Sequence, residues 1–187
     1  KGRYTIPSDT VCYPAKMVHG HIEALMDEGL ETIFYPCLSY NFDEGKGDNH
    51  YNCPVVAYYP EVLHANILKL RERNFLYPYF DLNLRKEFER RAYAYFSDHF
   101  DFITRKEIKT AAEAGYAAYA KWQQELKDEG ARVLAWAREH GKRIAVLSGR
   151  PYHVDPEINH GIDKLLTSLG LVVVSEDCVS DLVEPQK

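Results

Sequence analysis

Apolar residues along this chain follow two patterns, which predict helices and buried strands in alternation. Helical spacing predicts helices at residues 12–27, 85–96, 104–140 and 159–169. Short, fully apolar runs predict buried strands at residues 32–35, 143–147 and 171–175. Short apolar strands separated by amphipathic helices indicate an α/β fold, with parallel sheets flanked by helices.

Polar residues and glycines mark the ends of the first predicted helix. Ser8 and Asp9 precede that helix and are preferred N-cap residues, and Gly29 suits the C′ position at its end. Residues 38–52 are rich in Asn, Asp and Gly, which predicts a loop.

The segment after this loop is compatible with two structures. Pro54 suits the first turn of a helix, whereas the β-branched and aromatic residues at 55–58 favour a strand. A helix is then expected from residue 59 to residue 68. Residues 74–78 predict a short strand or a loop with a turn.

The long helical stretch divides the chain into three parts. We expect a first α/β lobe at residues 1–103, a helical connector at residues 104–142 with a break near Gly115 or Gly130, and the start of a second α/β lobe at residues 143–187. Both lobes are expected to be Rossmann-like, the second truncated because only about two strands are present. The chain starts without methionine and stops just after a strand, so we expect a fragment of a larger protein.

Composition and charge exclude several classes of protein. The 187 residues are 45% hydrophobic and 27% charged, which is ordinary for a globular protein. A net charge of -5 argues against a nucleic-acid or membrane surface. No apolar run approaches the roughly 18 residues of a transmembrane helix, and no signal peptide opens the chain. We therefore expect a cytoplasmic location.

Four cysteines are the main chemical feature of the sequence. They are Cys12, Cys37, Cys53 and Cys178. A chain of this size with an ordinary core does not need disulfides, and nothing indicates export. In a reducing compartment, the remaining interpretations are metal ligands, a catalytic thiol or buried structural residues.

Three of these cysteines stand at the predicted ends of helices or strands. Cys12 and Cys53 lie at or near helix starts, where free N–H groups and the helix dipole favour a thiolate. Cys37 directly follows the strand at 32–35, and ligands of parallel sheets bind beyond the carboxyl ends of strands. Their spacings, 25 and 16 residues, match neither paired zinc knuckles nor a ferredoxin run. They suit a [4Fe–4S] cluster with one open iron, although three separate buried cysteines remain an alternative.

Other candidate site residues have an ordinary structural interpretation beside the functional one. Lys16, one turn after Cys12, could supply positive charge near thiolates or be a solvated helix lysine. Arg150 could bind an anion such as a CoA phosphate or pair with a carboxylate. His153 lies in the loop after the strand at 143–147 and is a functional candidate. Cys178 is interpreted as structural, and His19 as a packed or surface residue.

Several segments together resemble a known family. They are Pro7-Ser8-Asp9-Thr10-Val11-Cys12-Tyr13-Pro14-Ala15-Lys16, Phe34-Tyr35-Pro36-Cys37, Asn52-Cys53-Pro54-Val55-Val56, and the stretch from Gly149 to Gly161. In this order, and over nearly the whole chain, they resemble the uncharacterised domain attached to CoA-substrate-specific enzyme activases.

This resemblance implies a cofactor and partners. The domain is similar to the cluster-bearing subunits of 2-hydroxyacyl-CoA dehydratases, in which three cysteines hold a [4Fe–4S] cluster and an ATP-driven activase injects one low-potential electron. It implies that Cys12, Cys37 and Cys53 are cluster ligands, that ATPase activase modules on the same polypeptide are partners, and that an acyl-CoA is the substrate. The chain has no P-loop, so we expect it not to hydrolyse ATP, and to be inactive alone.

Three hypotheses follow. The first is an iron–sulfur electron-transfer module. The second is a non-catalytic binding or docking domain, for a CoA ester or a partner subunit, without a working cluster. The third is a thiol enzyme that uses one cysteine and His153, for which no local nucleophile signature is present.

Overall fold

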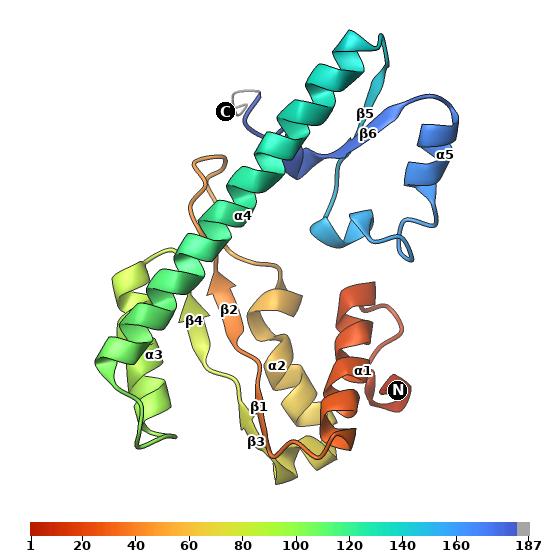
Figure 1. The fold of residues 1–187 in the computed structure, drawn as a ribbon. Helices are drawn as coiled ribbons and strands as arrows, with labels where there is room; N and C mark the ends of the chain where they lie inside the picture. Colours follow the sequence, from red (N-terminus) through yellow and green to blue (C-terminus); the bar gives the residue numbers. More distant parts are fainter. Residues whose placement is uncertain (183–187) are drawn as a thin grey trace. The chain divides into compact units, whose positions relative to one another are not determined.

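The computed structural model describes residues 1–182 and has an α/β fold (Figure 1). Its helices are α1 (Tyr13–Asp27), α2 (Pro54–Asn66), α3 (Arg85–Ser97), α4 (Arg105–Glu139) and α5 (Ile162–Ser168). Its strands are β1 (Thr32–Phe34), β2 (Cys37–Tyr40), β3 (Asn74–Leu76), β4 (Tyr79–Asp81), β5 (Ile144–Leu147) and β6 (Val172–Ser175). The chain forms two compact units, which divide between Ala112 and Glu113, within α4.

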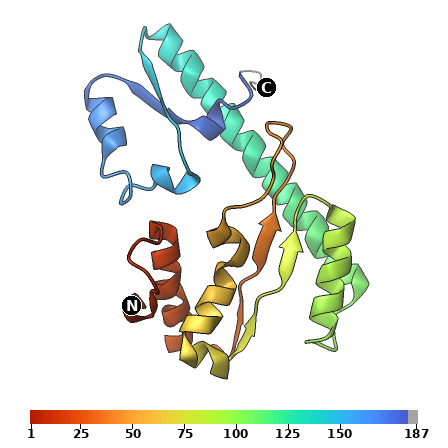
Figure 2. The ribbon, with the colours of Figure 1, turned by 180° about the vertical axis from the view of Figure 1, so that it is seen from behind.

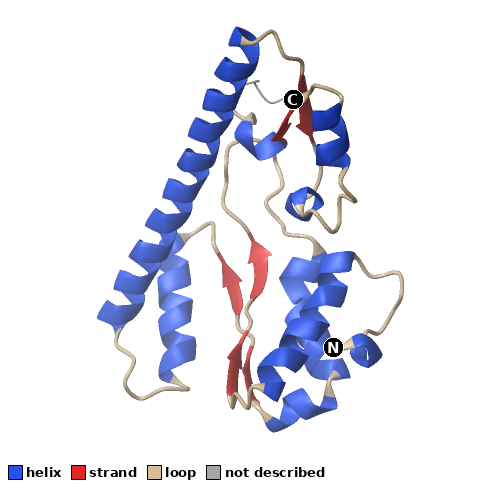
Figure 3. Cartoon of the chain, turned by 45° about the vertical axis from the view of Figure 1, so that its right-hand side comes forward, coloured by secondary structure: helices blue, strands red, loops and turns tan. Residues whose placement is uncertain are grey.

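A two-stranded parallel ribbon is the centre of the first unit. β1 pairs with β3, and β2 pairs with β4, and the two pairs follow one another end to end (Figure 3). Phe34 is opposite Leu76 and Cys37 is opposite Tyr79. The two residues between the pairs are Tyr-Pro in both strands, so two Tyr-Pro dipeptides face each other across the ribbon.

These prolines explain why the ribbon is interrupted without coming apart. The backbone N–H of Tyr35 donates to the Leu76 carbonyl, and that of Cys37 donates to the Pro78 carbonyl, each at 2.8 Å. In a regular parallel ladder, residue 78 would donate in return to the carbonyl of Tyr35. Pro78 has no N–H and cannot do so. The ladder therefore loses a bond at one point and resumes at Cys37.

Helices cover both faces of this ribbon (Figures 1 and 2). Side chains alternate between the faces, so Ile33, Tyr35 and Cys37 share one face. On this face Ile33 belongs to a buried core that includes Leu63 of α2. The remaining members of that core are Ala15, Ile22, Met26, Tyr59, Ile67, Leu70 and Phe75.

Aromatic residues hold α3 against the opposite face. Phe34 of β1 and Phe80 of β4 both contact Phe96 of α3, with ring centroids 5.4 and 6.4 Å apart. Phe80 also contacts Phe88 edge-on, at 5.2 Å. Because large rings meet here and the aliphatic core lies on the other side, the short ribbon is sandwiched between two apolar layers.

The second unit contains one β–α–β motif. β5 and β6 are parallel and in full register, from Ile144 opposite Val172 to Leu147 opposite Ser175. The connection between them contains α5. No helix within residues 1–182 is long and apolar enough to cross a membrane.

Helix α4 continues through both of its glycines, so the expected break near Gly115 or Gly130 is wrong. One glycine costs about 1 kcal/mol relative to alanine, which a long helix tolerates. Gly130 has a packing role, because a Cβ there would lie 2.5 Å from the carbonyl oxygen of Cys178. The glycine therefore lets the segment around Cys178 approach the helix.

Other local expectations also need correction. Ser8 and Asp9 are not the N-cap of α1, because Cys12 occupies that position. Leu38 to Tyr40 form β2 rather than a loop. α2 begins at Pro54, which excludes a strand at 55–58. α5 begins only at Ile162, and β4 was not predicted.

A buried histidine joins the N-terminal segment to α1 and α2. His19 has no exposed surface. Its Nδ1 lies 2.8 Å from the Thr5 hydroxyl, and its Nε2 lies 2.9 Å from the Tyr59 hydroxyl. Thr5 donates its single proton to the carbonyl of Gly2, so it accepts from Nδ1–H, and the Tyr59 hydroxyl donates to Nε2. The imidazole is therefore neutral, and all its hydrogen-bonding groups are used.

This histidine should make stability depend on pH. Burial lowers the pKa of His19 below its ordinary value of about 6.5. The unfolded chain gains a proton as the pH falls through that value while the folded chain resists it. The free energy of unfolding should therefore decrease below about pH 6.5. We expect His19→Gln to remove much of this dependence in urea denaturation between pH 7.5 and 5.5.

The matched control is His21→Gln, which changes an exposed histidine of the same helix. It should keep the pH dependence of the original chain. Equal pH slopes for the original protein and both variants would contradict the role given to His19.

A candidate cysteine site

Cys12 and Cys53 occupy equivalent positions on two helices. Each is the N-cap residue of its helix, α1 for Cys12 and α2 for Cys53. Their backbones are nearly identical, with φ and ψ of −62° and 157° for Cys12 and −61° and 153° for Cys53. A proline follows in the first turn of each helix. Neither N-cap side chain makes a capping hydrogen bond, so the first backbone N–H groups of both helices lie close to a cysteine and have no side-chain partner there.

Cys37 lies deeper than the other two cysteines. It is the first residue of β2 and has no exposed surface, whereas Cys12 and Cys53 are half-buried. Burial raises the pKa of its thiol, while hydrogen bonding from the backbone of Glu61 acts in the opposite direction. Cys37 therefore packs against α2 just beyond the proline interruption of the ribbon.

Three tyrosines connect the surroundings of the three cysteines. The pKa of Tyr35 is raised by burial and by the neighbouring Cys37, Tyr59 and Cys53. The pKa of Tyr59 is raised by burial and by the neighbouring Cys12. Cys37 and Cys53 are therefore neighbours of Tyr35, and Cys12 is a neighbour of Tyr59 in α2.

Tyr79 is the most perturbed of these tyrosines. Hydrogen bonding with the Glu61 carboxylate raises its pKa strongly, with further contributions from burial and from Cys37. The Tyr79 hydroxyl therefore stays protonated. Its single proton goes to the Glu61 carboxylate, so its oxygen is left as an acceptor toward Cys37.

The cysteines are close to common neighbours but do not form a metal-holding group. All four cysteines are free thiols. Among the described residues, no three or more His, Cys, Asp or Glu side chains are arranged to hold a metal ion. The donor set fits an iron–sulfur cluster in chemistry, since it comprises three thiols, two of them at helix N-termini.

Lys16 holds the segment before α1. Its ammonium donates to the backbone carbonyl of Asp9 at 2.7 Å. Because Asp9 lies three residues before Cys12, this bond fastens the loop that leads into the cysteine. A role of Lys16 as a positive charge near the thiolates stays a prediction.

Arg150 and His153 belong to the second unit, in the loop after β5. His153 Nδ1 accepts a hydrogen bond from the backbone N–H of Arg150 at 3.0 Å, and both side chains are exposed. In the same loop, Ser148 Oγ and Gly149 N–H donate to Glu176, at 2.5 and 3.3 Å. The loop is thus tied to the end of β6.

Cys178 has a separate environment. Its sulfur lies 3.3 Å from the Ser175 hydroxyl, and its backbone packs against Gly130. Both neighbours lie in the second unit, and the cysteine is half-buried. The structural role expected for Cys178 stays a prediction.

The tyrosines and Glu61 were missed in the sequence. The available signal was the repeated Tyr-Pro dipeptide, at 35–36 and 77–78, which the register places face to face. Tyr59 and Glu61 gave no comparable signal, because their nearness to the cysteines depends on packing between residues distant in sequence.

These features define an α/β protein that carries free thiols at the N-caps of two helices and at the first residue of one strand. A model of the family described as the CoA enzyme activase uncharacterised domain matches residues 1–179. The chain therefore belongs to this family of CoA enzyme activase domains. No curated protein and no solved structure matches the chain.

The burial differences predict an order of thiol reactivity. The thiolate is the reactive form, so a buried thiol with a raised pKa reacts slowly. We expect Cys37 to be alkylated by iodoacetamide at least about tenfold more slowly than Cys12 or Cys53 in the native, metal-free chain. Peptide mass spectrometry over a time course would measure each site. In urea the four rates should converge, and a native Cys37 that reacts as fast as Cys53 would contradict this description.

Proposed function

We propose that this chain is the iron–sulfur electron-transfer module of a CoA enzyme activase, related to 2-hydroxyacyl-CoA dehydratase. In this proposal Cys12, Cys37 and Cys53 hold a [4Fe–4S] cluster. A bound cluster of this kind would supply one-electron transfer at low potential. The observation that supports it best is that two of these free thiols, Cys37 and Cys53, neighbour Tyr35, while the third, Cys12, neighbours Tyr59.

Groups of the chain would stabilise the thiolate form of the cysteine ligands. The N-termini of α1 and α2 carry partial positive charge and free N–H groups, which stabilise thiolates. The backbone of Glu61 would do the same for Cys37. This support matters most for Cys37, because a thiol must lose its proton to bind a metal and burial opposes that loss.

Loading the cluster would require local rearrangement. The described residues contain no preformed metal-holding group, so the three side chains would have to turn toward one another. Cys12 and Cys53 stand at the first residues of helices and are half-buried, which leaves their side chains room to move. Lys16 would help by fastening the segment before Cys12.

The electron donor, the substrate and the cellular location are also part of the proposal. An ATP-driven activase module on the same polypeptide would deliver the electron, and an acyl-CoA would be the final substrate. Arg150 and His153 would contribute to binding an anionic group of that ligand. A reducing compartment such as the cytoplasm suits a protein with four free thiols.

A second candidate is a binding or docking domain for a CoA ester or a partner subunit, without a working cluster. The observation that favours it is that residues 1–182 contain no side-chain group arranged to hold a metal. In that case the three cysteines would be packing residues, which agrees with the full burial of Cys37.

Serine substitutions separate these two functions. Under anaerobic reconstitution, the original chain should take up about four irons with broad absorption near 400 nm, as expected of a thiolate-held cluster. Cys12→Ser, Cys37→Ser and Cys53→Ser should each lose most of this iron, because each removes one protein ligand. Iron and acid-labile sulfide analysis would provide the measurement.

Cys178→Ser is the matched control, since Cys178 is also half-buried but contacts Ser175 in the second unit. It should retain full iron. If all four variants bind as much iron as the original chain, the ligand assignment is wrong. If the original chain itself binds no iron after reconstitution, the docking function is favoured.

A further inference from the structure

Strand β5 has one edge that no other strand covers. Within residues 1–182, β6 is the one strand that pairs with it. The Val172 N–H donates to the carbonyl of Arg143, and alternate residues of a strand face the same partner in a ladder. The N–H and C=O groups of Ile144 and Val146 therefore point away from β6. These groups form an edge on which a further strand can pair.

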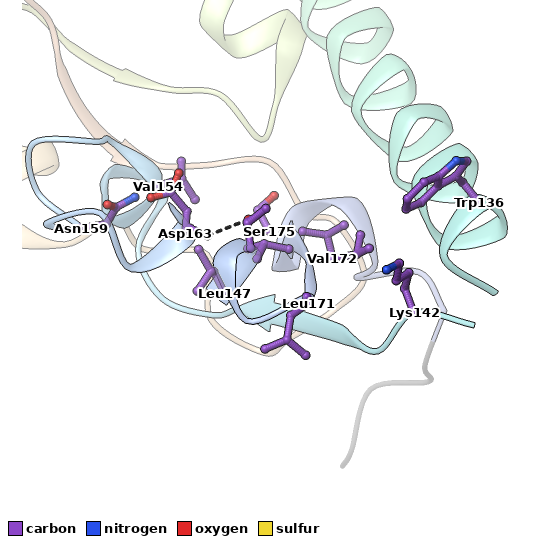
Figure 4. Close-up of a pocket in the computed structure, with 13 residues that line it drawn as sticks. Trp136, Lys142, Leu147, Val154, Asn159, Asp163, Leu171, Val172 and Ser175 are labelled. Carbon is purple, nitrogen blue, oxygen red and sulfur yellow. Dashed lines mark hydrogen bonds between the residues drawn. The ribbon is translucent and has the colours of Figure 1, made fainter. Parts of the chain in front are cut away.

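The layer that covers this sheet stops short of β5. Val146 and Val174 are opposite each other in the ladder and so share a face. Val174 is 7% exposed, whereas Val146 is 48% exposed. A pocket of about 630 Å³ also lies along the strand pair, with Lys142 at one end and Leu147 nearer the other (Figure 4). Parallel strands are usually covered on both faces and continued by neighbours, so β5 lacks part of its ordinary surroundings.

None of the usual protections of a free edge is present in β5. Its sequence is Ile-Ala-Val-Leu, without a charged residue or a proline. It pairs with β6 in full register, without a bulge. Proteins commonly protect their edge strands by charges, prolines or bulges, and an unprotected apolar edge is a site of pairing with another chain. The edge of β5 therefore favours the addition of a strand.

Unlike charges flank the two ends of β5. Lys142 and Arg143 precede the strand, and both are exposed. At the other end, the Glu176 carboxylate accepts hydrogen bonds from the Ser148 hydroxyl and the Gly149 N–H. One end of the strand is therefore positive, while a carboxylate is held at the other end.

This distribution of charge makes β5 complementary to a second copy of itself. Identical strands that pair across a twofold axis run antiparallel, so the start of one strand meets the end of the other. Arg143 of each copy then lies beside Glu176 of the other copy, and the ion pair occurs twice. Asp177 adds a second carboxylate at that end, against the single cation Arg150, so the end stays negative.

We propose that the free edge of β5 is an interaction surface for a second copy of this chain, with the two β5 strands paired antiparallel across a twofold axis. The pairing provides hydrogen-bond partners for the backbone of Ile144 and Val146 and joins Arg143 to Glu176. It is independent of the iron–sulfur function, because these residues all belong to the second unit.

Oligomeric state and amide exchange test the proposal on the unchanged chain under reducing conditions, which prevent disulfides between copies. Sedimentation between about 1 and 200 µM should show a monomer–dimer equilibrium. In the dimer, amide exchange of Ile144 and Val146 should slow at least about fivefold, because their N–H groups become hydrogen-bonded. Ala145 and Leu147 already face β6 and should change less than about twofold. A chain that stays monomeric over this range would overturn the proposal.

Two charge reversals then identify the surface. Arg143→Glu and Glu176→Lys each place like charges together at both ends of the paired strands. Each should raise the dimer dissociation constant about tenfold, the effect expected when two exposed ion pairs are replaced by repulsions. An equimolar mixture of the two variants should recover the original affinity, because each variant supplies the charge that the other lacks.

Lys121→Glu is the matched control, since it changes the net charge of the chain by the same amount at an exposed position of α4. It should change the dissociation constant less than about twofold. Thermal unfolding would check that all three variants are folded. If folded Arg143→Glu dimerises like the original chain, or if the mixture recovers no dimer, association uses another surface and the proposal is wrong.

Discussion

The pairing of two Tyr-Pro dipeptides across one parallel ribbon is the constraint on which the first unit depends. The register places Pro36 opposite Pro78. The ribbon therefore lacks the hydrogen bond that residue 78 would donate, and it keeps the backbone hydrogen bonds on either side. Because side chains alternate along a strand, this register also decides which face each residue occupies. It sends Tyr35 and Cys37 toward α2, and Phe34 and Phe80 toward α3.

The cysteine site follows from that arrangement. Cys37 lies against α2, and Cys53 begins the same helix. Cys12 is brought in by α1, whose His19 is hydrogen-bonded to Tyr59 of α2. Tyr35 neighbours Cys37 and Cys53, and Tyr59 neighbours Cys12. The buried position of Cys37 limits access by solvent.

Features that depend on local periodicity could be predicted from the sequence. The α/β class, β1, β5, β6 and the long helix α4 were all expected, because their apolar patterns are continuous. β2 and β4 were missed because each is short and follows a proline. A proline predicts the end of a strand when the partner strand is unknown. The N-cap of α1 was misplaced because cysteine is not a preferred capping residue, although Pro14 in the first turn marks the start of the helix.

The candidate site was predictable in its cysteines and not in its surroundings. Cys12, Cys37 and Cys53 could be singled out by their places at element ends and by a family resemblance. Tyr59 and Glu61 reach them through the packing of α2 on the ribbon, and Tyr79 reaches Cys37 through the pairing of β4 with β2, and no local pattern encodes either contact.

The central claim is that Cys12, Cys37 and Cys53 converge on one iron–sulfur cluster. The most direct measurement is a crystal structure of oxygen-free, reconstituted protein with anomalous scattering recorded at the iron absorption edge. The account predicts one compact iron-containing peak within bonding distance of the three sulfurs, at about the 2.3 Å typical of metal–thiolate bonds. Three sulfurs that remain apart, with no iron peak near any of them, would contradict it.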